Sequence, residues 1–300
     1  MAQPVARCAQ LHGVITRTAT PFIDGLYFGE GPRWHDGRLW FSDFYDEAVF
    51  SVGTGGDKRR EVDVPGQPSG LGWLPDGRLL VVRMTSREVL RREPDGTLVV
   101  HGSLDPWAGF HANDMVVSED GRAYVGNFGF DLTGLFEGRA QQCNTSLVRI
   151  DPDGTSHEAA PDMAFPNGSV IFPGGKLLVV AESFGERLTG FDVAADGTLS
   201  GRRVWAPLLG RAADGICLDA EGRIWVANPA ANECLLVAEG GEIVDQVTTS
   251  LPCVACMLGG PDRRTLYCVT VPTTDDRIAR TRRDGKIEQV EVDVEGAGLP

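Results

Sequence analysis

The chain of 300 residues lacks the long hydrophobic segments that a membrane or secreted protein needs. No window of about 18 apolar residues occurs, so we expect no transmembrane helix. Residues 1–20 lack the continuous apolar stretch of a secretory signal. These absences predict a cytoplasmic protein that does not associate with a membrane.

The chain is also poor in basic residues, with 28 Lys and Arg against 42 Asp and Glu and a net charge of −14. Binding to phosphates needs clustered Lys and Arg, so we expect no nucleic-acid partner. The seven cysteines are an odd number, and we expect them to be reduced thiols. Cys253 and Cys256 have the spacing of a metal-binding pair, but a second pair and nearby histidines are missing, which disfavours zinc.

What the chain does contain is a repeated segment, in which a turn glycine precedes a short apolar run. The repeat positions are Gly37, Gly77, Gly121, Gly175, Gly222 and, in the sixth copy, Arg263. A repeat of about 40 to 50 residues built from short strands is typical of a β-propeller. A second set of Asp-Gly turns lies between the first, at 95–96 and 153–154 for example, and each turn predicts a β-hairpin. We therefore expect an all-β, six-bladed propeller with four-stranded blades.

The repeats run almost from end to end, so we expect residues 1–300 to form a single propeller domain. Residues 1–12 are expected to be a flexible N-terminus, and the segment 13–20 to close the last blade as an added strand. Residues 128–146 break the repeat spacing. Their centre, 131–140, is expected to form a short helix or an ordered flap, which is either functional or a neutral surface insertion.

Polar residues recur about seven positions before the turns, where the first strand of each blade begins. They are Glu30, Ser69, Asn113, Asn167, Asp214 and, at a looser match, Cys253. Because the first strand of a blade is the innermost, these residues should ring the mouth of the channel. Buried carboxylates are costly unless paired or metal-bound, and no Lys or Arg occurs at the same offset. Converging carboxylate and amide oxygens fit a hard divalent cation, whereas the alternative is that they only cap strands and turns.

These motifs resemble those of the SMP-30/gluconolactonase/regucalcin (LRE-like) family, in order and over nearly the whole chain. The matching segments are 29–34, 113–114, 166–168 and 214–215. The resemblance implies a six-bladed propeller with a divalent metal at the channel mouth and hydrolysis of lactones. By position it also implies that Glu30, Asn167 and Asp214 are the metal ligands and that Asn113 binds substrate.

The chain departs from this family at His111, because members that act on sugar lactones often carry arginine two residues before the asparagine. A shorter, titratable side chain thus replaces a fixed cation with five donors. His111 is a candidate substrate-binding residue, and hydrogen bonding to a loop is the alternative. Aromatic residues also favour a pocket less polar than a sugar site, although packing between blades would explain most of them: Phe44, Tyr45, Trp107, Phe110, Phe128, Phe130 and Phe184.

A second set of polar residues ends the second strands. Of these, Asp43 and Asn127 are expected to hydrogen-bond the metal ligands. The sequence thus predicts a metal-dependent hydrolase that opens a lactone by attack of water, with Asp214 as both ligand and general base.

One divalent cation is expected, Ca²⁺ first and Mg²⁺, Mn²⁺ or Zn²⁺ as alternatives. The partner is a small-molecule substrate, and the sequence does not indicate an oligomeric state. Two other functions remain open. The same metal site could serve phosphotriester hydrolysis or a lyase or hydratase step, or the protein could be a non-catalytic calcium-binding propeller.

Overall fold

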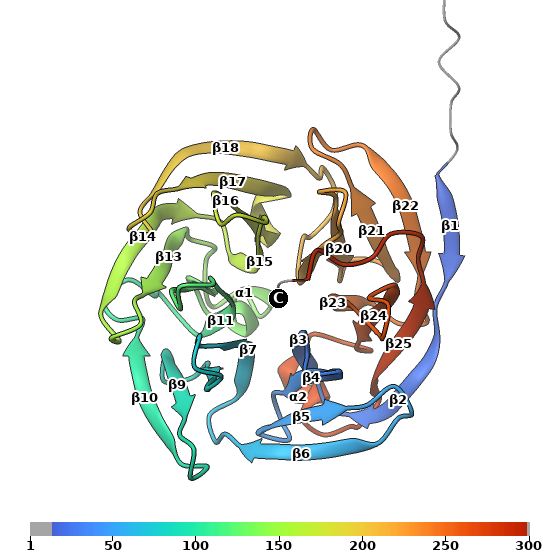
Figure 1. Cartoon of the computed structure of the whole chain (residues 1–300), viewed down its shortest axis with the longest axis horizontal. Coiled ribbons are helices and arrows are strands. Elements are labelled where there is room, and N and C mark those ends of the chain that lie inside the picture. The colour runs from blue at the N-terminus through green and yellow to red at the C-terminus, as the bar shows by residue number, and fades with distance from the viewer. Residues whose placement is uncertain (1–13, 299–300) are drawn as a thin grey trace, which may run out of the picture.

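The computed structural model describes residues 14–298, which form a ring of six β-sheets around a common axis (Figure 1). The strands of each blade follow one another from the axis outward, and neighbouring strands within the blade are antiparallel. The prediction of a six-bladed propeller with four-stranded blades is confirmed. The predicted flexible segment 1–12 lies outside the described residues.

The first three blades follow the chain directly, and the innermost strand comes first in each. Blade 1 consists of β3 (Gly29–His35), β4 (Arg38–Asp43), β5 (Ala48–Val52) and β6 (Lys58–Asp63). Blade 2 consists of β7 (Pro68–Trp73), β8 (Leu79–Arg83), β9 (Glu88–Arg92) and β10 (Leu98–Ser103). Blade 3 consists of β11 (Ala112–Val117), β12 (Ala123–Asn127), β13 (Thr145–Ile150) and β14 (Ser156–Met163).

The last three blades repeat this order, but the final two also recruit the start of the chain. Blade 4 consists of β15 (Pro166–Ile171), β16 (Leu177–Glu182), β17 (Arg187–Val193) and β18 (Leu199–Pro207). Blade 5 consists of β19 (Ile216–Leu218), β20 (Ile224–Asn228), β21 (Glu233–Val237) and β22 (Ile243–Thr248). Blade 6 consists of β23 (Cys253–Gly259), β24 (Thr265–Thr270), β25 (Gly285–Glu291) and, outermost, β2 (Thr20–Leu26).

The ring is closed by β2, which pairs antiparallel with β25 and so joins the two ends of the propeller. The strand before it, β1 (Ile15–Thr18), instead runs parallel to β22 on the outside of blade 5. The prediction that an N-terminal strand closes the last blade is therefore confirmed, but its assignment to residues 13–20 is wrong. Both blades offer an unpaired outer edge, and the exposed segment before Thr20 has no buried face that would mark its partner in the sequence.

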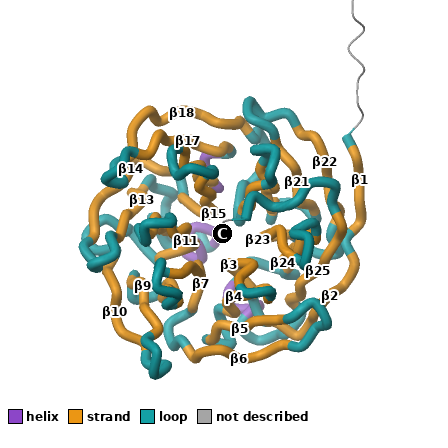
Figure 2. Tube along the Cα trace, viewed as in Figure 1, coloured by secondary structure: helices purple, strands orange, loops and turns teal. Residues whose placement is uncertain are grey.

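The loops between the second and third strands differ sharply in length around the ring. Four of them, 44–47, 84–87, 183–186 and 229–232, have four residues each, and one of these includes the single helical turn η1 (Ser183–Gly185). The other two loops are long and belong to blades 3 and 6, which are opposite each other in a ring of six. They carry the two short α-helices visible in Figure 2, α1 (Leu132–Phe136) and α2 (Asp276–Ala279). The predicted helix within 131–140 is confirmed, whereas the second insertion was not predicted.

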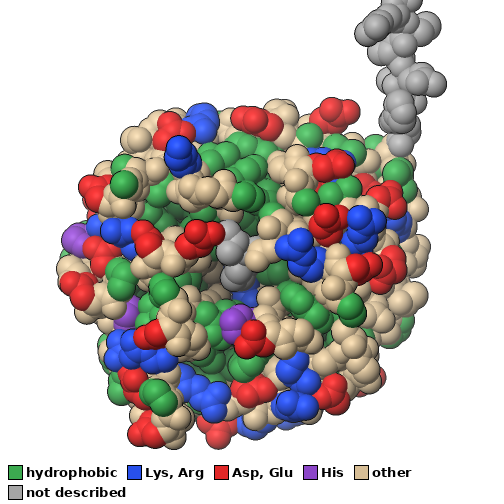
Figure 3. All heavy atoms as spheres, in the orientation of Figure 1, with side chains coloured by type: hydrophobic (Ala, Val, Ile, Leu, Met, Phe, Trp, Pro, Cys, Tyr) green, Lys and Arg blue, Asp and Glu red, His purple; other side chains and the backbone are tan. Residues whose placement is uncertain are grey.

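Apolar side chains fill the spaces between neighbouring blades. Leu39, Phe41, Leu80 and Val125, for example, are fully buried in one continuous core. Acidic and basic side chains are interspersed over the face drawn in Figure 3, and many form surface ion pairs such as that between Arg60 and Asp63. Neither helix of residues 14–298 is long and apolar enough to cross a membrane.

Five cysteines gather between blades 5 and 6, where they are buried from solvent. This buried thiol group comprises Cys217, Cys234, Cys253, Cys256 and Cys268. The sulfur atoms of Cys217 and Cys256 are 3.8 Å apart. The Cys256 thiol also donates to the carbonyl oxygens of Gly215, at 3.6 Å, and Trp225, at 3.5 Å. Burial raises the pKa of Cys253 well above its ordinary value. These contacts suit buried thiols that pack as small apolar groups.

Candidate functional site

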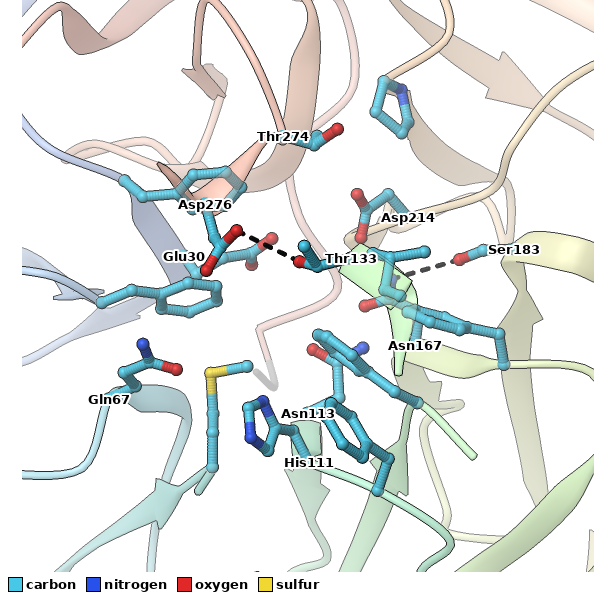
Figure 4. A pocket seen from close by; sticks show the side chains of 18 of the residues that line it. Glu30, Gln67, His111, Asn113, Thr133, Asn167, Ser183, Asp214, Thr274 and Asp276 are labelled. Carbon is cyan, nitrogen blue, oxygen red and sulfur yellow. Dashed lines mark hydrogen bonds between the residues drawn. The ribbon is translucent and has the colours of Figure 1, made fainter. Parts of the chain in front are cut away.

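Four of the predicted ring residues line one cavity at the mouth of the propeller axis. Glu30, Asn113 and Asn167 lie at the starts of β3, β11 and β15, and Asp214 lies two residues before β19. Figure 4 shows their side chains converging from four different blades. The cavity has a volume of about 440 Å³. Ser69 and Cys253 do not line it, so the predicted ring of six is wrong at these two positions: Cys253 belongs to the buried thiol group.

Glycines beside the polar residues bring the inner strands close together. Gly31 has φ +54°, and its N–H donates to the Glu30 carboxylate at 2.9 Å. A Cβ atom on Gly168 would lie 2.6 Å from the backbone nitrogen of Ile216 and 2.7 Å from the carbonyl oxygen of Asp214. Blade 5 can therefore approach blade 4 only because position 168 has no side chain. The glycines of the sequence motifs thus set the distance between the candidate ligands.

The charges at this site do not cancel. Arg33 donates to Asp114 at 2.8 Å, and both side chains are almost completely buried. Arg33 also donates to the carbonyl oxygens of Pro32 and Met115, and these bonds hold its guanidinium beside Asp114. Its positive charge therefore balances the charge of Asp114. Within residues 14–298, Glu30 and Asp214 have no basic partner. Two carboxyl groups are therefore left facing the cavity without a basic partner, and when both are ionised their charge is the one that a single divalent cation neutralises.

The pKa values of the two carboxyl groups reflect this imbalance. Burial, followed by the charges of Asp214 and Asp114, raises the pKa of Glu30 well above its ordinary range. Burial and the charge of Asp114 do the same to the pKa of Asp214, and a hydrogen bond from Asn167 opposes the shift. Both carboxyl groups are therefore easier to protonate than ordinary carboxyl groups, and a bound cation would favour their charged forms.

Asn167 is oriented by a chain of hydrogen bonds. Its Nδ2 donates to Ser183 Oγ at 3.2 Å, and Ser183 Oγ donates to the carbonyl oxygen of Ala213 at 2.6 Å. The buried Oδ1 atom of Asn167 accepts no hydrogen bond from the described part of the chain. An amide oxygen left free in this way beside two carboxylates is a suitable donor set for a hard cation such as Ca²⁺. The residues present therefore fit the predicted metal, although their roles as ligands stay a prediction.

The expectation that Asp43 and Asn127 hold the ligands is wrong. Asp43 accepts hydrogen bonds from the backbone N–H groups of Tyr27 and Phe28, at 2.9 and 3.1 Å. Asn127 accepts from the N–H of Gly129 at 3.1 Å. Both side chains turn toward the neighbouring loops, because the ends of the second strands lie beside backbone donors that need acceptors. Ser183 takes the supporting role instead.

His111 lies directly before β11, and its side chain lines the cavity. Its ring stacks on that of Phe110, with 4.2 Å between the ring centroids. Burial lowers the pKa of His111, and the charge of Asp131 only partly opposes the shift. The imidazole is therefore neutral at pH 7, unlike the arginine that it replaces. Asn113 also lines the cavity, and its buried Nδ2 atom has no hydrogen-bond partner within residues 14–298.

Aromatic side chains form much of the remaining wall. Of the seven predicted rim residues, Trp107 and Phe130 do not line the cavity, whereas Phe44, Tyr45, Phe110, Phe128 and Phe184 do. Sequence reasoning missed Phe28, Phe165 and the residues contributed by the loop 271–284, which are Thr274, Asp276 and Arg280. The loop could have been recognised, because the interval between the last apolar strand and the turn at Gly285 is longer than a hairpin needs.

Comparison with known proteins agrees with this architecture. The structure is similar to the calcium-binding protein regucalcin from Agrobacterium tumefaciens, with a TM-score of 0.80 and 20% identity over 97% of this chain and 99% of that one. A gluconolactonase from Xanthomonas campestris aligns with a TM-score of 0.73 and 21% identity, over 91% and 89% of the two chains. Virginiamycin B lyase from Staphylococcus aureus is more distant, with a TM-score of 0.58 and 12% identity over 93% and 89%. At these identities the likeness establishes the fold.

The sequence itself matches a family model, described as the SMP-30/gluconolactonase/LRE-like region, over residues 28–272. The match spans all six inner strands and each of the four cavity-lining polar residues, and it leaves out β1, β2 and β25. It confirms the resemblance found in the motifs. The chain therefore belongs to the SMP-30/gluconolactonase/LRE-like family.

Proposed function

We propose that this protein is a divalent-metal-dependent hydrolase of the lactonase type, which opens a small-molecule lactone with water. The observation that carries the proposal is the donor set at the propeller mouth. Glu30 and Asp214 lack a basic partner among the described residues, and the free oxygen of Asn167 lies beside them. The gluconolactonase and the calcium-binding regucalcin of the same fold support the reaction class and favour Ca²⁺.

In this proposal Glu30, Asn167 and Asp214 hold the cation. When bound, the cation would polarise the lactone carbonyl and lower the pKa of water. Asp214 also accepts the proton of the attacking water, and the ring ester bond then breaks as that proton passes to the leaving alkoxide. Asn113 donates to the substrate through Nδ2, and His111 contacts the ring of the lactone through its cavity-facing edge. Ser183 keeps the Asn167 oxygen directed at the cation.

The proposal is tested by assaying the EDTA-stripped protein against lactones while Ca²⁺, Mg²⁺, Mn²⁺ or Zn²⁺ is added. Turnover should depend on the metal, and Asn167→Ala should lose both metal binding and turnover. Asp36→Asn is a matched control, because the Asp36 side chain is 86% exposed and far from the cavity in the turn between β3 and β4. Full lactone turnover without bound metal would refute the proposal.

A second candidate function, a calcium-binding propeller without catalysis, is favoured by the similarity to regucalcin. Tight Ca²⁺ binding with no turnover of any lactone or phosphotriester would support it. We also propose a cytoplasmic location and no nucleic-acid partner. The reduced thiols of the described chain and the net charge of −14 support these two proposals.

A further inference from the structure

The two long insertions meet over the cavity, although they come from opposite blades. Thr133 Oγ1, on α1, donates to Asp276 Oδ1 on α2 at 3.1 Å. Arg277 Nη1 donates to Glu137 Oε1 at 2.6 Å. We call these two contacts the clasp. Figure 4 shows the contact between Thr133 and Asp276 spanning the space beside Glu30 and Asp214.

The insertions also supply part of the cavity wall. Leu132 and Phe136 line it from α1, and Arg280 lines it from just after α2. The Arg280 guanidinium already has partners within the protein. It donates a hydrogen bond to Asp276 at 2.7 Å and lies 5.3 Å from the centre of the Tyr45 ring. Asp276 and Arg280, which could otherwise bind the hydroxyl groups of a sugar, are thus paired with each other, and Asp276 also accepts from Thr133 of the other insertion.

Below the insertions the cavity has two aromatic walls. On one side Phe28 stacks on Phe44, with 4.8 Å between the ring centroids. On the other side Phe128 stacks on Phe165 at 4.6 Å, and Phe184 lies 5.2 Å from Phe165. A polyhydroxylated ring between these walls would lose its hydrogen bonds to water without replacement, which opposes binding. An apolar group would be released from water instead.

We propose that the substrate is a lactone with an apolar ring or alkyl chain, which is enclosed between the aromatic walls under the clasped insertions. This inference rests on the function proposed above and names its substrate class. The exposed ion pair between Glu137 and Arg277 is weak, so the insertions can separate to admit the substrate and close again over its apolar part. The neutral His111, stacked on Phe110, extends the same apolar surface to the reacting end of the cavity.

The test is a comparison of kcat/KM for δ-hexalactone, δ-nonalactone, δ-dodecalactone and glucono-δ-lactone with the metal-loaded protein. Burial of one methylene contributes about 0.8 kcal/mol, so kcat/KM should rise up to about fourfold per added methylene until the cavity is filled. Glucono-δ-lactone should be poorer than δ-nonalactone by up to about 60-fold, because three methylenes stay unburied. Equal rates along the alkyl series, with glucono-δ-lactone the best substrate, would overturn the inference.

Phe136→Ala tests the wall without threatening the fold, because the Phe136 side chain is 66% exposed. It should reduce the gain in kcat/KM between δ-hexalactone and δ-dodecalactone. Leu209→Ala is the matched control, since Leu209 is 78% exposed and does not line the cavity. An unchanged chain-length dependence in Phe136→Ala, or an equal loss in both variants, counts against the proposed wall.

The clasp is tested with Glu137→Ala, Arg277→Ala and the double variant. Each single variant should lower kcat/KM for δ-nonalactone severalfold, and the double variant should be no worse than either single one. Effects that multiply in the double variant would show that the two residues act separately, which contradicts the clasp.

Binding of alkyl-substituted δ-valerolactams, measured by calorimetry, separates this inference from the proposed function. Lactams resist hydrolysis but fill the same space. If the affinity for the lactams rises with chain length but no lactone is opened, the cavity binds apolar chains as inferred and the hydrolase proposal is wrong. If lactones are opened but lactam affinity does not depend on chain length, the hydrolase proposal stands and the substrate class fails.

Discussion

Replacing Asp214 with asparagine should make the metal-free protein more stable, even though the change removes a candidate ligand. In the metal-free fold the Asp214 and Glu30 carboxyl groups crowd each other and Asp114, whose charge alone is balanced by Arg33. Both pKa values are raised, so the folded protein is destabilised when these groups ionise. Asparagine at position 214 removes one of the charges and keeps a similar shape.

The size of the effect follows from the pKa shift. Each pKa unit by which folding raises a carboxyl group corresponds to about 1.4 kcal/mol at pH 7. For each such unit, Asp214→Asn should raise the unfolding temperature of the metal-free protein by about 3 °C, at about 2 °C per kcal/mol for a large domain. In the unchanged protein, Ca²⁺ at 100 times its Kd should add about 2.7 kcal/mol, or roughly 5 °C. Asp214→Asn should lose this response.

The direction of the pH dependence provides an independent check. Because the carboxyl pKa values are raised on folding, their contribution to stability is fully present below about pH 4, the ordinary carboxyl range. It is lost as pH rises toward the higher pKa values of the folded state. The metal-free protein should therefore lose stability between pH 4 and 7, and Ca²⁺ should stabilise it more at pH 7 than at pH 5. Asp214→Asn should weaken both trends.

The assay is thermal unfolding of EDTA-treated protein, with and without Ca²⁺, at pH 5 and pH 7. Asp36→Asn serves as the control for a change of charge at an exposed position. The reasoning is refuted if Asp214→Asn lowers the unfolding temperature of the metal-free protein and still responds to Ca²⁺ like the unchanged protein.

Three further predictions concern the support of the site and the core. Ser183→Ala should weaken Ca²⁺ binding about tenfold or more, as loss of a supporting hydrogen bond commonly does, while circular dichroism stays unchanged; an unaltered Kd by calorimetry would contradict the orienting role. Gly168→Ala should lower the free energy of unfolding, measured with a chemical denaturant, by about 1–3 kcal/mol through overpacking. Gly55→Ala should leave this free energy nearly unchanged, because no atom lies within 4 Å of the new Cβ. In the native protein the five cysteines of the buried thiol group should not react with a thiol reagent until the chain unfolds, while the exposed Cys143 should react at once. Rapid labelling of these buried cysteines in the native protein would show that the interface between blades 5 and 6 opens readily.

The sequence predicts the repeated elements of this protein well. The turn glycines mark five of the six blades and Arg263 marks the sixth, and the offset from the turns places Glu30, Asn113, Asn167 and Asp214 at or near strand starts close to the axis. Such residues are predictable because the same local geometry recurs in each repeat, so that one correctly placed turn positions the whole blade. The family motifs add the expected chemistry.

Features that depend on contacts between different blades could not be predicted in this way. Arg33 neutralises Asp114, which is 81 positions away, and no spacing in the sequence connects them. The pairing of β1 with blade 5 is equally hidden, since an exposed edge accepts any extended segment. The insertion that carries α2 changes the repeat length without a distinctive motif, and its meeting with α1 depends on the ring bringing opposite blades together over the axis.

The pairing of β2 with β25 has a consequence for the synthesis of the protein. On the ribosome, Thr20–Leu26 is translated about 260 residues before its partner, Gly285–Glu291. At about 5–20 residues per second, β2 waits on the order of 10 to 50 s for this partner. During that time earlier blades can form, but the ring stays open and the edge of β2 is available to other nascent chains. Expression at high rates should therefore favour domain-swapped or aggregated material, and slower translation should favour the closed ring.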